Sequence, residues 1–291
     1  MPEGGEYRSD DPVLARPVAL SPAAVPPAPL PARPVDPLDL SHINSLPAAG
    51  GVILTLLTVA LTLFGVPIVA VALADTLGWF STTDPHSGDG LLLASKWVEA
   101  GLAMLVAAVC LWRLRVRPAG LGLHFQRPSR QAAWALAALA CVYAAMIGFA
   151  IFVIPLINAF PQMQRDLAHR VEFVQMVPVS NVGMAALLMA AVAIHEEVLF
   201  RGLLIPLLAR VLRSKTAAVM ASSALFGALH ITQGFMATVQ IGFVGAALGI
   251  CFVASRSLPA VIVAHFLFNL LQLQLMRLLP SAEELLRELQ K

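Results

Sequence analysis

Charged residues are scarce in this sequence, and their scarcity excludes an ordinary water-soluble fold. Asp, Glu, Lys and Arg together make up 12% of the 291 residues, whereas hydrophobic residues make up 58%. Soluble domains carry roughly a quarter charged residues, so this chain cannot cover a surface that faces water. The mean hydropathy of +0.80 instead indicates a protein that lies in the lipid bilayer.

Cysteine pairs and a large excess of one charge are also lacking. The three cysteines, Cys110, Cys141 and Cys251, fall in separate apolar runs without a partner at ligand spacing. The sequence therefore argues against a disulfide framework or a thiolate metal site, and it favours small buried side chains at these positions. The net charge of +2 gives no reason to expect a nucleic acid as partner.

The first 45 residues lack the long apolar runs of the rest of the chain. They are rich in proline and alanine, as in residues 26–31. Such a segment cannot build a packed core, so we predict a disordered tail. Acidic residues between Glu3 and Asp11 outnumber the lone Arg8 there, and no apolar h-region follows, so we do not expect a signal peptide.

Beyond the tail, hydropathy predicts an all-α fold, a polytopic transmembrane helical bundle of about seven spans. The predicted spans are at about residues 50–76, 91–113, 131–157, 182–206, 215–232, 236–255 and 257–279. Each approaches the roughly 20 residues that a helix needs to cross the hydrocarbon layer. Helices are expected because an open sheet edge would find no hydrogen-bonding partner in lipid.

Basic residues gather in every second connection between the predicted spans. The second connection holds Arg113, Arg115, Arg117, Arg127 and Arg130, the fourth holds Arg210, Arg213 and Lys215, and the sixth holds Arg256. The first connection has no Lys or Arg and carries acids such as Asp84 and Asp89. The positive-inside rule therefore places the even connections and the N-terminus in the cytosol.

A few ionisable side chains interrupt the apolar spans, and the fourth span holds most of them. It contains the run His195-Glu196-Glu197, followed by Arg201. Ionisable groups in a span are costly and usually face a bundle interior or a wet cavity. Glu197 and Arg201 stand four residues apart, so we expect an ion pair on one face of the helix. Glu196 points about 100° away, which leaves its carboxyl group free to take or give a proton.

Two histidines and an asparagine lie on later spans. His230 is in the fifth span, and His265 and Asn269 share one face of the seventh because they stand four residues apart. Together with Glu196 they can activate a water, stabilise an oxyanion and protonate a leaving amine. Glu196, His230 and His265 also have the donor atoms for a divalent metal such as zinc, so both interpretations stay open. The HExxH zinc motif is absent because Leu199 occupies the position of its second histidine.

The motifs on these three spans resemble, in the same order, those of the CPBP intramembrane proteases. That family includes type II CAAX prenyl endopeptidases and bacteriocin-processing or immunity-type members. The resemblance covers about residues 180–280, and the first three spans carry no motif of the family. The matching motifs are Glu196-Glu197-x-x-x-Arg201, Phe226-x-x-x-His230 and His265-x-x-x-Asn269.

The resemblance implies peptide hydrolysis inside the membrane. By this resemblance, Glu196 activates the water with help from His230, and His265 and Asn269 bind the substrate carbonyl group and its oxyanion. We expect no cofactor, although the resemblance also fits a metal-dependent mechanism in which Glu196, His230 and His265 are the ligands. The residues expected to hold the site in shape are Glu197, Arg201 and Phe226.

The sequence as a whole predicts four regions. These are a tail at 1–45, N-terminal transmembrane helices at 46–180, a catalytic core at 181–280 and a short polar C-terminal helix at 281–291. The pattern from Ser281 to Glu284 is that of a capping box, which opens this last helix. We expect a multi-pass protein of the bacterial plasma membrane that acts on a membrane-associated peptide or protein. Nothing in the sequence indicates an oligomeric state.

A non-catalytic membrane protein is the alternative hypothesis, either a proton-coupled transporter or an immunity factor that acts by binding. Intramembrane Glu and His side chains also serve proton relays. A relay needs polar groups through the full depth of the bilayer, whereas hydrolysis needs one cluster. The outer halves of most predicted spans hold almost nothing ionisable, which favours a cluster. We further expect the cavity around this cluster to open towards the cytosol, and Lys96 and Glu99 to reach the outer membrane interface.

Overall fold

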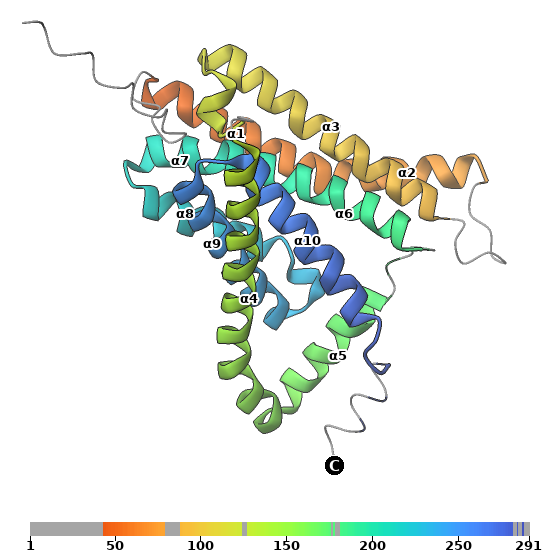
Figure 1. Cartoon of the computed structure of the whole chain (residues 1–291). Helices are drawn as coiled ribbons and strands as arrows, with labels where there is room; N and C mark the ends of the chain where they lie inside the picture. The colour runs from red at the N-terminus through yellow and green to blue at the C-terminus, as the bar shows by residue number, and fades with distance from the viewer. Residues whose placement is uncertain are drawn as a thin grey trace, which may run out of the picture. The chain divides into compact units, whose positions relative to one another are not determined.

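The described part of the chain consists of helices and short connections (Figure 1). The computed structural model describes residues 43–78, 88–123, 127–175, 177, 181–281, 284 and 287. The predicted Pro-rich tail lies outside these residues except for its last three positions. The helices are α1 Ser45–Ala60, α2 Val66–Thr76, α3 Asp89–Leu114, α4 Pro128–Ala159, α5 Pro161–Gln175, α6 Val182–Glu197, α7 Ile205–Leu212, α8 Lys215–Ala228, α9 Phe235–Ser255 and α10 Leu258–Met276.

Two pairs of these helices are continuous through a π-helical segment. Leu61–Gly65 joins α1 to α2, and Val198–Leu204 joins α6 to α7. Within the described residues, six helical stretches are long and apolar enough to cross a membrane: Ser45–Thr76, Asp89–Leu114, Pro128–Ile157, Val182–Leu212, Phe235–Ser255 and Leu258–Met276. The predicted all-helical fold is confirmed, and the chain is a multi-pass integral membrane protein.

The fifth predicted span differs from the structure. Helix α8 has 14 residues, about 21 Å at 1.5 Å per residue, which is shorter than the roughly 30 Å of the hydrocarbon layer. Hydropathy extended this span to residue 232 because apolar residues continue into the 3₁₀ turn Ile231–Gln233. The chain then reverses at Gly234, whose φ of 104° is open to glycine but strained for other residues.

Helices α8 and α9 pack closely because small residues line their contact. A Cβ atom at Gly227 would lie 2.6 Å from the Thr238 carbonyl oxygen and 3.0 Å from the Gly242 backbone. Small residues allow helix backbones to approach closely in membranes, where packing and hydrogen bonds drive association. This contact fixes the end of α8, and with it His230, against the neighbouring helix.

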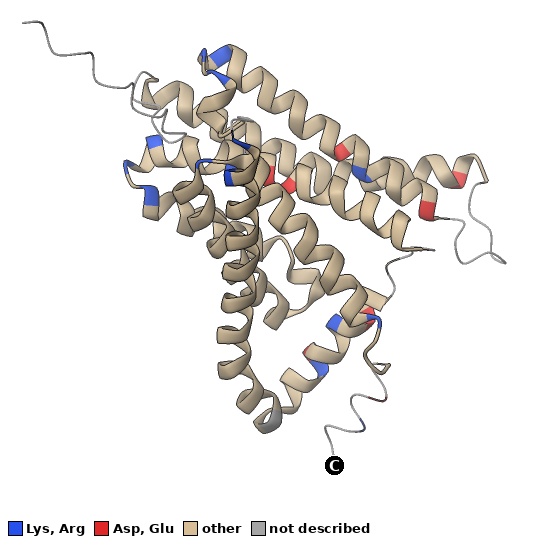
Figure 2. Cartoon of the chain, viewed as in Figure 1, with Lys and Arg blue, Asp and Glu red and all other residues tan. Residues whose placement is uncertain are grey.

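One end of the bundle is strongly basic. Arg115, Arg213 and Arg256 cap the C-terminal ends of α3, α7 and α9, each with a left-handed backbone (φ 52°, 54° and 57°). Figure 2 shows many of the Lys and Arg residues at this end, and others along α3 and on α5. We call it the basic rim, and it consists of Arg113, Arg115, Arg117, Arg127, Arg130, Arg210, Arg213, Lys215 and Arg256.

Candidate active site

The end of α6 supplies the two neighbouring glutamates of the site. Arg201 lies in the π-helical segment that follows Glu197, and its NH1 atom donates to Glu197 Oε1 at 2.7 Å. The Arg201 NH2 atom donates to the Gly245 carbonyl oxygen at 3.1 Å, and the guanidinium lies 4.6 Å from the centre of the Phe226 ring. The expected ion pair therefore forms, and it is fully buried, with side-chain exposures of 0% and 1%.

His265 on α10 joins this ion pair to the second glutamate. Its Nδ1 atom lies 2.6 Å from Glu197 Oε1. Because a carboxylate only accepts, Nδ1 carries the hydrogen of this bond, and Glu197 thereby fixes the tautomer and orientation of the ring. The Nε2 atom of His265 then lies 3.7 Å from Glu196 Oε2. Sequence reasoning gave Glu197 only Arg201 as partner and missed its bond to His265.

The His230 ring is held in one orientation by a backbone carbonyl group of α8. Its Nδ1 atom donates to the Phe226 carbonyl oxygen at 2.7 Å, which leaves Nε2 as the free ring nitrogen. The Phe226 ring packs 5.0 Å from the His230 ring and 6.1 Å from the His265 ring, measured between centres. Phe226 therefore packs against both imidazoles as well as against the Arg201 guanidinium.

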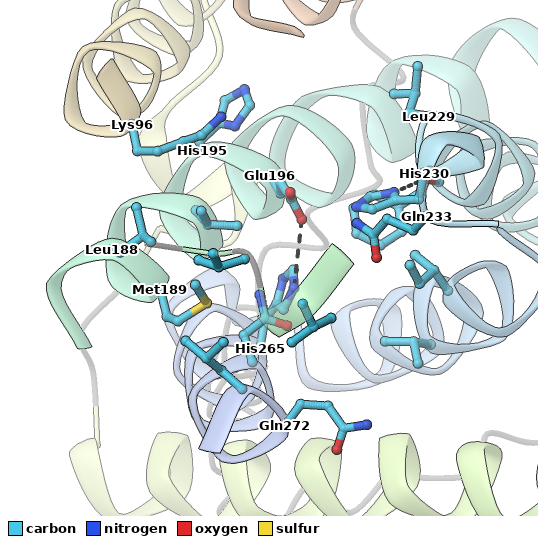
Figure 3. A pocket seen from close by; sticks show the side chains of 18 of the residues that line it. Lys96, Leu188, Met189, His195, Glu196, Leu229, His230, Gln233, His265 and Gln272 are labelled. Carbon is cyan, nitrogen blue, oxygen red and sulfur yellow. Dashed lines mark hydrogen bonds and ion pairs between the residues drawn. The ribbon is translucent and has the colours of Figure 1, made fainter. Parts of the chain in front are cut away.

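Glu196, His230, His265 and Asn269 all line one cavity of about 590 Å³. In Figure 3 the Glu196 carboxylate and the His265 ring face each other, and His230 and Gln233 lie on the other side of the cavity. Most of the remaining wall is apolar. The structure thus brings together four side chains from three separate segments of the sequence, whereas their catalytic roles stay predictions.

A metal ion would need several donors that converge. Among the residues that the structure describes, no three His, Cys, Asp or Glu side chains are grouped so that they could hold a metal ion. The three residues that the sequence offers as ligands if a metal is bound line one cavity but do not form such a group. They are Glu196, His230 and His265. We therefore derive no step of the reaction through a metal.

A second buried acid lies near the site, and the sequence prediction for it was wrong. Glu99 does not reach the outer interface but lies ten residues, about 15 Å, into α3 with 1% of its side chain exposed. Both of its oxygens accept from Lys96 Nζ at 2.9 Å. Lys96 lines the cavity. The signal that sequence reasoning overlooked is this Lys–Glu pair at i, i+3 inside an otherwise apolar span.

His195 connects Glu99 to the π-helical segment after α1. Its Nδ1 atom lies 3.7 Å from Glu99 Oε2, and its Nε2 atom lies 3.0 Å from the Thr62 hydroxyl oxygen. The Thr62 hydroxyl donates its hydrogen to the backbone, with Thr58 O at 3.0 Å, so it accepts from His195 Nε2. His195 and Thr62 both line the cavity.

Helix α5 holds the turn that follows His230. The Asp166 carboxylate accepts from the backbone N–H groups of Phe235 at 2.8 Å and Met236 at 2.7 Å, and so caps the N-terminus of α9. Arg170 NH1 donates to Gln233 Oε1 at 3.0 Å. Burial lowers the pKa of the Arg170 guanidinium, and the nearby Asp166 carboxylate opposes this shift. Two side chains of α5 thus fix the turn on which the position of His230 depends.

One of the three comparisons with known proteins found a match. Residues 178–271 match the family model described as type II CAAX prenyl endopeptidase Rce1-like. No curated protein and no solved structure matches the chain. The matched segment contains Glu196, Glu197, His230, His265 and Asn269, but neither Lys96 nor Glu99. Residues 178–271 of this membrane protein are therefore a domain of the Rce1-like type II CAAX prenyl endopeptidase family, which is a family of proteases.

Proposed function

We propose that this protein is an intramembrane endopeptidase in which Glu196 activates the hydrolytic water. The observation that carries the proposal is the position of Glu196 on one cavity with His230 and His265, whose Nδ1 atoms are both engaged elsewhere. Two Nε2 atoms and one carboxylate thus remain for water and substrate. This is the set of groups that general acid–base hydrolysis of an amide requires.

In the proposed reaction Glu196 takes a proton from the water as the water oxygen attacks the scissile carbonyl carbon. His230 Nε2 accepts a hydrogen bond from the water and aligns it. His265 in its protonated form donates from Nε2 to the oxyanion, beside the carboxamide of Asn269. Glu196 then gives its proton to the departing amine, so that one water and one amide yield a carboxylic acid and an amine.

Glu197 is assigned to positioning, not to proton transfer. Its Oε1 atom already receives hydrogen bonds from Arg201 and His265. A carboxylate held in this way fixes the tautomer and the orientation of the imidazole ring. Two adjacent glutamates therefore have different roles because only one of them is neutralised by a buried arginine.

The substrate class proposed here is a peptide that carries an apolar anchor, such as a prenylated or leader-bearing chain. The cavity places apolar side chains, among them Phe173, Leu188 and Leu273, beside the glutamate and histidines. Such a wall binds the apolar part of a ligand, while a few polar groups hold the scissile bond in position.

The decisive test is cleavage of an internally quenched lipopeptide by the purified protein and its Glu196→Gln variant. The rate should fall by about 10²–10⁴-fold because the base is lost. The thermal unfolding temperature should stay close to that of the wild type, because glutamine keeps the size of the side chain and His265 retains its hydrogen bond to Glu197. An active Glu196→Gln enzyme contradicts the proposal, and so does an inactive wild-type enzyme on a panel of prenylated and leader-type peptides.

A further inference from the structure

A second polar group faces the cavity from the side of α1 and α3. Lys96 lines the cavity together with Thr62, His195 and Glu196, and 27% of its side chain is accessible. Figure 3 shows Lys96 and His195 on one side of the Glu196 carboxylate and His230 on the other. The proposed reaction gives Lys96 no role. A cation inside an apolar span is costly to bury, so its position on the cavity wall calls for a reason.

The Lys96 ammonium is held in place by a carboxylate that does not itself line the cavity. Both oxygens of Glu99 accept from Lys96 Nζ at 2.9 Å, and the Glu99 side chain is 1% exposed. Glu99 also faces His195, whose Nδ1 atom lies 3.7 Å from its Oε2 atom. The ion pair therefore fixes a cation at the cavity wall, beside the helix that carries Glu196.

One N–H donor of Lys96 remains for a ligand. An ammonium group has three such donors, and the two Glu99 oxygens take two of them. The hydroxyl group of Thr62 cannot replace this donor, because it already donates to the Thr58 carbonyl oxygen and accepts from His195. The other side chains that α1, α3 and the segment after α1 contribute to the wall are apolar. They are Val59, Leu63 and Leu92.

The charge of the ion pair decides which acceptor it suits. Lys96 and Glu99 together carry no net charge, so an incoming carboxylate would compete with Glu99 and bring an unbalanced charge to an apolar wall. A peptide carbonyl oxygen brings no charge. It also requires a donor, because a peptide inside the cavity loses its hydrogen bonds to water. In the proposed reaction His265 and Asn269 serve the scissile carbonyl alone, so the neighbouring carbonyl groups need other donors.

We propose that Lys96 is a substrate-positioning residue, which donates a hydrogen bond to a backbone carbonyl group of the peptide other than the scissile one. Glu99 is the counterion that holds the ammonium at the wall, and it does not touch the substrate. In a helical segment each carbonyl group already accepts a bond within the segment, so this site takes an extended peptide. The inference rests on the proposed function and adds to it the backbone form of the substrate.

Two variants isolate the Lys96 donor. Lys96→Met alone would strand the buried Glu99 charge and destabilise the fold, so it is combined with Glu99→Gln. The matched control is Glu99→Gln alone, which keeps the ammonium. Both are made in a Glu196→Gln parent, to which a fluorescently labelled lipopeptide is titrated without being cleaved. Its dissociation constant should rise about tenfold or more when Lys96→Met is added to Glu99→Gln, whereas Glu99→Gln should stay within about threefold of the parent.

An ester scan of the same lipopeptide identifies the carbonyl group. Replacing one backbone amide by an ester weakens its carbonyl oxygen as an acceptor. Because an ammonium cannot accept a hydrogen bond, the N–H lost at the same position does not involve Lys96. One ester should weaken binding to the Glu99→Gln protein by about fivefold, but should change binding to the double variant by less than about twofold. Equal ester effects in both proteins at every position would overturn the proposal, as would equal dissociation constants or no binding to either protein.

Cleavage kinetics separate this inference from the proposed function. With Glu196 restored, adding Lys96→Met to Glu99→Gln should raise KM about tenfold and leave kcat within about threefold, because the bond is made equally in the ground state and the transition state. Cleavage with a KM that does not depend on Lys96 would refute this inference alone. The binding measurements need no cleavage, so binding that depends on Lys96 in a protein that cleaves nothing would refute the proposed function alone.

Discussion

Two buried acid–base–histidine groups lie near the cavity, one built around Glu197 and the other around Glu99. Each glutamate pairs with a cation on its own helix, Arg201 in one case and Lys96 in the other. Each also faces a histidine, but His265 lies 2.6 Å from Glu197 whereas His195 lies 3.7 Å from Glu99. The same three residue types thus give a tightly bonded group and a looser one.

This difference shows that burial of the cation determines how much stability is lost when its ion-pair partner is removed. Arg201 is 1% exposed, so Glu197 balances its charge where water cannot reach it, whereas 27% of the Lys96 side chain remains exposed. An ion whose partner is removed in a dry site costs far more than one that can still reach water. The Glu197 group should therefore tolerate substitution much less than the Glu99 group.

The largest effect is expected for Glu197→Gln. The substitution strands the Arg201 charge and releases His265, so folding should lose about 3–5 kcal/mol and cleavage should be abolished. Thermal unfolding in detergent and cleavage of the quenched lipopeptide measure the two losses. As a control, Glu197→Gln combined with Arg201→Met should regain stability without regaining cleavage. If the single variant is as stable as the wild type, the Glu197 group does not depend on its ion pair more than the Glu99 group does, which contradicts this prediction.

A smaller effect is expected for Glu99→Gln. Lys96 can stay hydrated, so the loss of stability should be about 1 kcal/mol. Cleavage should persist, because Glu99 lies outside the set assigned to the reaction. The same two assays apply, with Glu99→Gln combined with Lys96→Met as the matched double variant. If Glu99→Gln abolishes cleavage as Glu197→Gln does, the two groups are functionally equivalent and the distinction drawn here is wrong.

Thr62→Val should have a modest effect that is confined to the Glu99 group. It removes the hydroxyl oxygen that accepts from His195 Nε2 and leaves a partly buried donor without a partner, at about 1 kcal/mol or slightly more. Thr62→Ser keeps the hydroxyl and should restore most of this loss. Thermal unfolding distinguishes the pair, and equal unfolding temperatures for the valine and serine variants would show that the hydrogen bond contributes nothing.

The smallest effect concerns a fully exposed carboxylate, which extends the comparison to a group in water. Hydrogen bonds from the Ser281 backbone and hydroxyl lower the pKa of Glu284. Because the folded pKa lies below the unfolded one, the contribution to the C-terminal turn is present above the unfolded pKa and is lost as pH falls through the folded pKa. An NMR titration of the Ser281 amide should follow this loss, and Ser281→Ala should return the Glu284 pKa towards its ordinary value. A titration that is the same in Ser281→Ala would refute the cap.

Contacts within one helix were predictable because the helical period fixes them. The Glu197–Arg201 ion pair follows from a spacing of four residues, and the capping contacts between Ser281 and Glu284 follow from a spacing of three. The order of the three motifs likewise pointed to one site. Hydropathy predicted seven spans, and six of them correspond to helical stretches that are long and apolar enough to cross a membrane. These were predictable because a long apolar run in this chain has lipid as its solvent.

Contacts between helices were not predictable, since no local spacing encodes them. The bond between Glu197 and His265 joins residues 68 positions apart, and that between Thr62 and His195 joins residues 133 apart. The length of α8 belongs to the same class. It is set by a reversal at Gly234 that the carboxylate of Asp166, from a distant helix, holds in place.

The sequence by itself determined that this protein is an integral membrane protein and that Glu197 is the one of two adjacent glutamates that pairs with Arg201. It also predicted which residues carry the chemistry, and their roles stay predictions. Composition and helical periodicity suffice for these conclusions, because both act along the chain. Only the tertiary structure decided that Glu99 lies in the interior and that Lys96 lines the same cavity as Glu196. The depth and direction of a cavity depend on how tilted helices pack against one another. The lengths of the helices can be estimated from the sequence, but their tilt and packing cannot.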